Sequence, residues 1–345
     1  MKIVYDDIIY SLQKSGGISE LWSCVTRSLS SHPITHLVYR KSISNNLFVE
    51  EKNHSYIDCS SRLLLLKRYF NVRFKSDEPF IFHSSYYRTC TNPNAINVTT
   101  VHDFMYEYFH KEWKSNLHKI QKRNAVMNSD GIICISQNTA NDLRKFYPEV
   151  KGTIRVIYNG YDDTTYRFFY KERKKQLLYV GGRRHHKNFR FAAELCKHLK
   201  DYTLVIVGGG DLQADELNLL SGIRYTKKGY TSKEELADLY NSSFMLLYTS
   251  NYEGFGIPPI EAQACGCVVA CQNVSSLPEV VRDTTVFIKK DDIDGSVRQI
   301  LSCEDPQTYS RYQALGLDNV KRFSWEKCAS EYFSFYETLF QQKKS

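Results

Sequence analysis

Residues 253–261 read Glu-Gly-Phe-Gly-Ile-Pro-Pro-Ile-Glu, and they closely follow an apolar run, Phe-Met-Leu-Leu-Tyr at 244–248, that is typical of a buried strand. The glycines at 254 and 256 allow backbone to lie close to a ligand. The two prolines suit the start of a helix, where a missing N–H costs little. The stretch therefore predicts a strand, a glycine-rich turn and a helix, with Glu253 at the strand end and Glu261 in the first helical turn.

This segment offers the two kinds of group that a phosphorylated, hydroxyl-rich ligand needs. Backbone N–H groups at a helix N-terminus bind phosphate, and carboxylates accept hydrogen bonds from hydroxyl groups. Open α/β sheets bind their ligands at the carboxyl ends of the strands, where this segment is expected. The structural alternative is that Glu261 only complements the helix dipole. The spacing leaves both interpretations open, and the flanking sequence favours the ligand site.

Length and composition indicate a soluble α/β protein of two domains. The chain has 345 residues, of which 42% are hydrophobic. It has no run of 18 apolar residues that would predict a transmembrane helix, and residues 1–5 lead directly into a strand without the apolar stretch of a signal peptide. The ten cysteines are scattered without zinc-ligand spacing. They predict reduced, buried thiols and a cytoplasmic protein.

The net charge of +8 is distributed unevenly along the chain. Residues 1–160 contain 21 Lys and Arg against 14 Asp and Glu, a balance of +7, whereas residues 161–345 contain 25 against 24. The first half is therefore expected to meet an anionic partner, such as lipid headgroups, a pyrophosphate-linked substrate or nucleic acid.

The first half of the chain reads as alternating strands and helices. Gly16 and Gly17 precede a helix at 18–29 and either let a ligand approach its N-terminus or form a plain tight turn. The dinucleotide fingerprint G-x-G-x-x-G is absent there. Strands are predicted at 2–10, 36–39, 80–83, 97–101, 131–135 and 154–158, a polar loop at 41–56, and helices at 105–127 and 139–146.

Residues 62–70, Arg-Leu-Leu-Leu-Leu-Lys-Arg-Tyr-Phe, combine apolar and basic side chains. One interpretation is a core helix with solvated charges, and the other is a helix lying at a membrane surface. Because the basic residues do not fall cleanly on one face, the core helix is slightly favoured.

His102 directly follows the strand predicted at 97–101. A lone histidine is more often structural than catalytic. A position at the carboxyl end of a strand in an α/β sheet, however, favours a site residue.

The second half repeats the alternation after a linker at 161–175. A strand at 177–180 leads into Gly181-Gly182-Arg-Arg-His-His-Lys-Asn188, and glycines with three cations at a strand end are what a diphosphate needs. The alternative is a solvated basic loop. Further strands are predicted at 204–207, 223–225 and 268–270, and helices at 234–240 and 325–339, with the stretch 275–281 following the strand at 268–270.

Taken together, these pieces resemble the retaining glycosyltransferases of family 4, which have the GT-B fold. Residues 253–261 look like that family's motif of two glutamates with seven residues between them. Residues 179–189 resemble its phosphate-binding loop. Residues 16–19, 275–280 and 323–329 also match. The resemblance covers nearly the whole chain and is poorest at 41–95. Within the family, the chain is similar to bacterial mannosyltransferases that build O-antigen or capsule.

The resemblance implies an α/β architecture of two Rossmann-like domains with parallel sheets facing a central cleft. The acceptor-binding domain would comprise residues 1–160 plus 325–345, because the last helix returns to the first domain in this family. Residues 161–324 would form the domain that binds the nucleotide sugar.

The resemblance also implies roles for individual residues. Glu261 would bind the ribose hydroxyls, and Glu253 with the backbone of 254–257 would hold the donor hexose. Arg183, or its neighbour Arg184, and Lys187 would neutralise the diphosphate, while His102 would touch the sugar at the reacting centre. The implied catalytic residues are His102, Glu253, Arg183 and Lys187, and the implied donor-binding residues are Gly16, Gly17, Arg183, Lys187, Tyr230 near the base, Glu253, Gly254, Phe255, Gly256, Ile257 and Glu261.

The chemistry expected from the resemblance is transfer of a hexose with retention of configuration, by front-face attack in which a donor phosphate oxygen takes the acceptor proton. Stabilising the leaving diphosphate is then the main electrostatic task. Two cations and a helix N-terminus would do this without a metal, so no metal and no cofactor are expected. The expected donor is GDP-mannose or a UDP-sugar, and the expected acceptor is a glycan linked to undecaprenyl pyrophosphate.

Two other classes compete with this interpretation. A nucleotide-binding oxidoreductase would share the alternation, but the glycine fingerprint is missing. A basic RNA-binding protein would carry its charge in both halves or in a recognised motif, so no nucleic-acid partner is expected. The basic first half predicts instead a cytoplasmic protein held peripherally on the anionic inner face of the plasma membrane.

Overall fold

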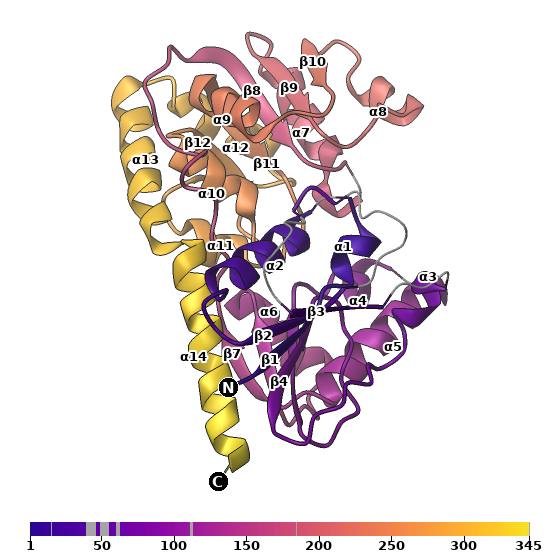
Figure 1. Cartoon of the computed structure of the whole chain (residues 1–345). Helices are drawn as coiled ribbons and strands as arrows, with labels where there is room; N and C mark the ends of the chain where they lie inside the picture. The colour runs from indigo at the N-terminus through magenta and orange to yellow at the C-terminus, as the bar shows by residue number, and fades with distance from the viewer. Residues whose placement is uncertain are drawn as a thin grey trace. The chain divides into compact units, whose positions relative to one another are not determined.

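The computed structural model describes residues 1–14, 16–38, 46–48, 55–59, 63–110, 113–183 and 185–344. The chain divides into two compact units (Figure 1). The first comprises Met1–Gly160 with Trp325–Ser345, and the second comprises Tyr161–Ser324. Each unit contains its own parallel sheet.

The first unit is built on a parallel sheet with strand order β3-β2-β1-β4-β5-β6-β7. The chain moves outward from β1 through β2 to β3 and then resumes with β4 on the other side of β1. The carboxyl ends of β1 and β4 therefore form a topological switch point, the usual place for a ligand in such sheets. The strands are β1 Ile3–Asp6, β2 Ile34–Val38, β3 Ser55–Asp58, β4 Phe80–Ser84, β5 Ala95–Val101, β6 Gly131–Cys134 and β7 Thr153–Val156.

Helices cover this sheet by burying apolar faces against it. The last helix, α14 (Trp325–Lys344, yellow in Figure 1), packs against α2 (Gly17–Ser28) and against β4 and β5. Its Tyr332, Phe335 and Tyr336 are at most 1% exposed, which explains why this aromatic-rich segment belongs with the first unit. The remaining helices are α1 Ile9–Leu12, α3 Leu64–Lys67, α4 Met105–Phe109, α5 Trp113–Met127 and α6 Gln137–Phe146.

The second unit has a sheet with strand order β10-β9-β8-β11-β12-β13, also parallel. The strands are β8 Lys174–Val180, β9 Thr203–Val207, β10 Tyr225–Lys228, β11 Ser243–Tyr248, β12 Val268–Gln272 and β13 Val286–Ile288. The chain runs outward from β8 to β10 and returns with β11 on the other side of β8. The adjacent ends of β8 and β11 are thus the switch point of this sheet.

The helices of the second unit enclose an apolar core on which its central strands lie. That core includes Leu177, Leu204, Met245 and Val268, one from each of four neighbouring strands. The helical segments are η1 His185–Lys187, α7 Phe189–His198, α8 Ala214–Leu219, α9 Lys233–Ser242, α10 Ile257–Ala264, α11 Leu277–Val281, α12 Ile293–Ser302, α13 Pro306–Asn319 and η2 Val320–Arg322.

Several predicted elements of the first unit differ in the structure. Residues 2–10 are not one strand, because β1 ends at Asp6 and Ile9 begins the helix α1, with its N–H donated to Ser85 Oγ at 3.0 Å. Strand β3 begins inside the loop predicted at 41–56, of which 41–45 and 49–54 lie outside the described residues. The helix predicted at 105–127 is two helices, α4 and α5.

The prediction of a core helix at 62–70 is wrong. The helix α3 covers only Leu64–Lys67, and Arg62 lies outside the described residues. Leu63, Leu66 and Phe70 are 62%, 56% and 66% exposed. Four helical residues cannot present an apolar face to a core and keep the charges outside, so Leu63, Leu66 and Phe70 remain at the surface.

Candidate functional site

The loops that follow β8 and β11 are joined by hydrogen bonds at the switch point of the second unit. The Thr249 hydroxyl contacts the carbonyl oxygens of Lys187 at 3.1 Å and Asn188 at 3.0 Å. The Asn251 N–H donates to the carbonyl of His186 at 2.7 Å. Asn188 adopts a left-handed backbone conformation with φ 50°, which a non-glycine residue holds only where its surroundings impose it. These contacts fix the backbone that carries Lys187.

Two serines after β12 hold the backbone of the glutamate motif. The Glu253 N–H donates to Ser275 Oγ at 2.9 Å, and the Ser276 hydroxyl contacts the carbonyl oxygens of Glu253 at 3.0 Å and Phe255 at 2.8 Å. Gln272, the last residue of β12, donates through Nε2 to the carbonyl of Thr249 at 2.7 Å. The glycine-rich turn is therefore held in place by a neighbouring strand end.

Lys187 and Glu253 form the ion pair at the centre of this arrangement. Lys187 Nζ lies 2.6 Å from Glu253 Oε1, and the two side chains are 25% and 12% exposed. Burial by itself raises the pKa of Glu253. The charge of Lys187 and hydrogen bonds from Lys187, Ser250 and Tyr248 outweigh it, so the pKa of this carboxyl lies below its ordinary value. Glu253 is thus an ionised hydrogen-bond acceptor, and its lysine partner is a cation beside it.

The helix α10 begins immediately after the turn. Its N-terminal cap, Gly256, has φ 115°, and a Cβ at this position would lie 3.0 Å from Leu277 Cδ2, so both conformation and packing favour glycine. Glu261 is the fifth residue of α10, not a member of its first turn as predicted. It is 9% exposed and accepts a hydrogen bond from the Tyr240 hydroxyl at 3.2 Å.

Arg183 lies in the loop after β8 and contacts the backbone of the loop after β9. Its Nε donates to Glu216 Oε1 at 2.8 Å, and its terminal nitrogens donate to the carbonyls of Gly208, Gly210 and Asp211 at 2.8–3.2 Å. Glycine is favoured at 209, because its φ of 78° is one that L side chains rarely adopt and a Cβ would lie 3.1 Å from the carbonyl oxygen of Gly181. The predicted contact of Arg183 with a diphosphate is therefore not prepared in this conformation, and Arg184 lies outside the described residues.

Tyr230 lies just beyond β10 and is 84% exposed. Like the other strand ends of this sheet, the end of β10 points toward the carboxyl edge where Lys187 and Glu253 lie. An exposed aromatic ring offers a stacking surface, and its predicted place near the base stays a prediction.

In the first unit, Gly16 is the N-terminal cap of α2 and Gly17 is its first residue, so the helix begins one residue before the predicted start at 18. Asp7, just after β1, ties this helix to the sheet: Trp22 Nε1 donates to Asp7 Oδ1 at 2.7 Å, and His36 Nδ1 lies 2.8 Å from Asp7 Oδ2. The two glycines thus follow a rigid strand end at the switch point of this sheet.

His102 directly follows β5 and is half-buried. Burial and the nearby charge of Lys122 lower its pKa to about 4. Lys122 is itself fully buried and donates to the carbonyl of Asp103 and to Glu107 Oε2, both at 2.8 Å. His102 is consequently a neutral imidazole near neutral pH, able to donate or accept a hydrogen bond.

Several residues that shape the site carry no local sequence signal. Glu216, Thr249 and Gln272 contact partners that are 21 to 62 positions away in the sequence, and many of these partners are backbone atoms. For Thr249 and Gln272, the position just after a strand or at its end is the one signal that could have marked them, whereas Glu216 lies within α8. Ser275 and Ser276 lie in a stretch that matched the family, but no role was predicted for them.

In the part of the chain that the structure describes, no group of three or more His, Cys, Asp or Glu side chains gathers as metal ligands would. No described helix is both long enough and apolar enough to cross a membrane. All ten cysteines lie in the described ranges and none is in a disulfide; Cys24 and Cys59 are half-buried and the others buried.

Family models and known proteins match parts of this chain in sequence. The family described as "Glycosyl transferases group 1" matches residues 163–315, and the one described as "Glycosyltransferase Family 4" matches residues 32–165. The O-antigen chain mannosyltransferase B of Escherichia coli is 35% identical over 175 residues, 47% of this chain and 45% of that protein. The O-antigen chain mannosyltransferase RfbU of Salmonella typhimurium is 28% identical over 68% of this chain and 70% of its own length.

Solved structures give the fold. A sucrose-phosphate synthase of Thermosynechococcus elongatus superposes with a TM-score of 0.78 over 99% of this chain and all of that chain, at 19% identity. HepE of Anabaena, solved with UDP-glucose, superposes with a TM-score of 0.72 over 98% of this chain, at 13% identity. The predicted GT-B fold, with one parallel sheet in each of two Rossmann-like units, is confirmed. With these matches in both halves, the chain belongs to glycosyltransferase family 4.

Proposed function

We propose that this chain is a retaining hexosyltransferase that moves mannose from GDP-mannose onto a glycan acceptor in the synthesis of a surface polysaccharide. The observation that carries the proposal is the Lys187–Glu253 pair, held at the switch point of the second unit by contacts from three neighbouring strand ends. Two of its relatives are O-antigen mannosyltransferases, and this similarity supports the choice of mannose over a UDP-sugar donor.

The donor is proposed to bind at the carboxyl edge of the second sheet. Ionised Glu253 accepts hydrogen bonds from the hexose hydroxyls, together with the backbone of 254–257, and Glu261 accepts from the ribose hydroxyls. Lys187 faces the diphosphate with its charge. The guanidinium of Arg183 is hydrogen-bonded to the Glu216 carboxylate and to loop carbonyls. Arg183 would therefore have to leave these partners before it could contact the diphosphate.

The proposed reaction breaks the bond between the anomeric carbon and the diphosphate oxygen and forms a glycosidic bond to the acceptor oxygen on the same face. The acceptor hydroxyl proton passes to an oxygen of the leaving diphosphate. Negative charge grows on that diphosphate in the transition state, and a fixed cation such as Lys187 stabilises it more than it stabilises the ground state. His102, as a neutral imidazole, is proposed to contact the donor sugar. The chain's cations would do this work without a metal ion.

The acceptor is proposed to be a glycan carried on a polyprenyl pyrophosphate at the inner face of the plasma membrane, with the first unit binding it. This unit carries the basic excess, and exposed Leu63, Leu66 and Phe70 lie beside Lys67 and Arg68. Apolar side chains next to cations suit a peripheral contact with an anionic membrane surface.

A donor screen tests the proposal. The purified chain is incubated with GDP-mannose and with UDP-hexoses, each with and without a membrane extract that contains lipid-linked glycans, and released nucleotide is measured. We expect acceptor-dependent release of GDP. Acceptor-dependent release of UDP would keep the transferase and replace the donor, and no release from any donor would refute the proposal.

A further inference from the structure

A cavity of about 680 Å³ opens in the first unit beside the carboxyl ends of β2 and β3. Leu37, near the end of β2, and Cys59, directly after β3, line one side of it. Residues 70–75 line the other side, and a parallel bridge from Val72 to Cys90 holds that segment against the unit. The predicted donor and catalytic residues do not line this cavity.

The charged side chains that line the cavity are all cations. They are Lys67, Arg73, Lys75 and Arg88. Lys67, Arg73 and Lys75 are exposed at the rim, whereas Arg88 is 5% exposed. Such a cavity attracts an anion, because three of these charges have no carboxylate among the other lining residues.

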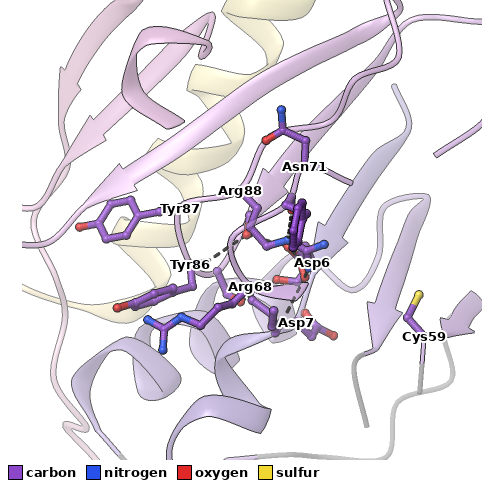
Figure 2. A network of polar contacts seen from close by, with 12 residues as sticks. Asp6, Asp7, Cys59, Arg68, Asn71, Tyr86, Tyr87 and Arg88 are labelled. Carbon is purple, nitrogen blue, oxygen red and sulfur yellow. Dashed lines mark hydrogen bonds and ion pairs between the residues drawn. The ribbon is translucent and has the colours of Figure 1, made fainter. Parts of the chain in front are cut away.

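Arg88 is fixed in place below that rim. Its Nε donates to the carbonyl of Phe70 at 3.0 Å, and its Nη1 lies 3.3 Å from Asp6 Oδ2. Figure 2 shows Arg88 reaching toward Asp6 at the end of β1, with Cys59 apart from them, directly after β3. Asp6 balances Arg88, and the backbone bond positions the segment that carries Arg73 and Lys75. The cation-lined wall is therefore part of a packed network and not a set of loose surface side chains.

The same cavity is bordered by exposed apolar groups. Phe70 and Ile57, which line it, are 66% and 46% exposed, and Leu66 next to Lys67 is 56% exposed. Apolar surface of this extent gains from contact with a hydrocarbon chain. A free phosphate or sugar phosphate would leave this surface in water, so the combination matches an amphiphile that joins a phosphate group to an apolar chain.

We propose that this cavity binds the phosphate end of the lipid carrier on which the acceptor glycan is attached. Lys67, Arg73 and Lys75 contact the phosphate oxygens, and Phe70, Ile57 and Leu66 contact the adjoining hydrocarbon. The proposal rests on the proposed function for the presence of a lipid-linked acceptor. It adds the place where the protein holds the lipid phosphate end of that acceptor, which is the end opposite to the reacting sugar hydroxyl.

Cys59 provides a local reporter for the test, since its thiol lines the cavity and is half-buried. Farnesyl diphosphate serves as a soluble polyprenyl diphosphate. The alkylation rate of Cys59 by N-ethylmaleimide is followed by peptide mass spectrometry, with half-buried Cys24 in α2 as the internal control. We expect farnesyl diphosphate to slow alkylation of Cys59 severalfold and to leave the rate at Cys24 unchanged.

Two charge variants test the contacts. In Arg73→Ala/Lys75→Ala, the concentration of farnesyl diphosphate that half-protects Cys59 should rise by roughly tenfold or more, because charge-assisted contacts to phosphate are lost. The matched control, Arg27→Ala/Lys151→Ala, removes two exposed cations of the same unit away from the cavity and should protect like wild type. Thermal unfolding of both variants verifies folding.

Four outcomes would overturn the proposal. Cys59 could remain unprotected, or the Arg73/Lys75 variant could protect as well as wild type. Inorganic pyrophosphate or farnesol could protect as well as farnesyl diphosphate, which would assign the cavity to a free anion or to apolar contact alone. Short-chain phosphatidylglycerol could protect equally, which would assign it to bulk membrane lipid.

Nucleotide release from GDP-mannose, measured on the same protein, separates this proposal from the proposed function. Protection of Cys59 without release from any donor would leave the lipid phosphate site and refute glycosyl transfer. Release of nucleotide without protection of Cys59 would support glycosyl transfer and refute the lipid phosphate site.

Discussion

Replacing Lys187 by Met removes the charge from the Lys187–Glu253 pair and keeps an apolar side chain of similar length. In the structure the pair is 2.6 Å long, and its side chains are 25% and 12% exposed. Loss of a single group that stabilises charge growing in a transition state typically costs about 10²–10³ in kcat, or about 2.7–4 kcal/mol. We expect a loss of this order in kcat/KM for GDP-mannose.

The same change should also lower the stability of the fold, because Glu253 is left without its cation. Removing one partner of a buried pair costs about 3–5 kcal/mol, and the partial exposure of this pair reduces the expected loss to about 1–3 kcal/mol. This is measured as the free energy of unfolding in urea, separately from the kinetics. Lys197→Met, which breaks an exposed pair with Glu194 in the same unit, is the matched control and should change neither quantity by more than a small amount.

The pH dependence gives a second signature of the pair. The pKa of Glu253 is held below its ordinary value of 4.5, so its ion pair stabilises the fold fully above that value and loses this contribution as pH falls through the depressed pKa. In Lys187→Met burial acts without the opposing charge, which raises the pKa of Glu253. The acid limb of the rate profile should therefore move to higher pH.

A double-mutant cycle with Glu253→Gln decides whether Lys187 acts on the donor or only on Glu253. If Lys187 also stabilises the leaving diphosphate, its replacement in the Glu253→Gln background should still reduce kcat/KM at least about tenfold, a residual loss of about 1.4 kcal/mol. No further loss in that background would refute the diphosphate role. A single-variant loss smaller than about threefold, with the fold intact, would refute the reasoning as a whole.

Other parts of the proposal are tested by simpler measurements. Glu261→Ala should raise the donor KM more than it lowers kcat, since ribose contacts are alike in the ground and transition states; a pure kcat effect would contradict this. Arg183→Lys should lower the melting temperature, because the planar contacts to the loop after β9 are lost, whereas an unchanged melting temperature with collapsed kcat would place Arg183 on the diphosphate. EDTA should leave transfer largely intact, and loss that Mg²⁺ or Mn²⁺ restores would require a metal. The chain should co-sediment with anionic vesicles at low salt and dissociate as salt rises, because each cation near the surface contributes about 1 kcal/mol that salt screens. Lys67→Ala/Arg68→Ala should weaken vesicle binding. Absence of binding at low salt would favour a soluble acceptor.

Much of the architecture could be predicted because it depends on local patterns. The runs at 177–180, 204–207 and 244–248 are apolar and bounded by glycines or polar residues, and each lies within a strand of the structure. The aromatic-rich stretch that begins at Trp325 forms α14. Where such patterns are short or ambiguous, the prediction failed, as at 2–10, because an apolar residue after Asp6 fits a helix or a strand equally well until Ser85 supplies its hydrogen bond.

Within the candidate site, the motif of two glutamates and the loop that carries Lys187 could be identified from residue types and spacing. The partner of each group could not. Lys187 and Glu253 are 66 residues apart, and Arg183 and Glu216 are 33 apart. Lys187 therefore forms its ion pair with the glutamate motif, whereas Arg183 is bound by Glu216 and by the carbonyls of a loop. The sequence places both cations in one stretch and does not distinguish them.

What the sequence by itself determined is the alternation of strands and helices, the glycine turns at strand ends, and the residue types able to bind phosphates and hydroxyls. These follow from side-chain periodicity and backbone freedom over a few neighbouring residues. The tertiary structure alone decided which carboxylate neutralises which cation, the low pKa of His102, the exposure of Leu63, Leu66 and Phe70, and the cation-lined cavity beside β2 and β3. Each of these depends on distances and burial between segments far apart in the chain, which the packing of the sheets sets and local sequence does not.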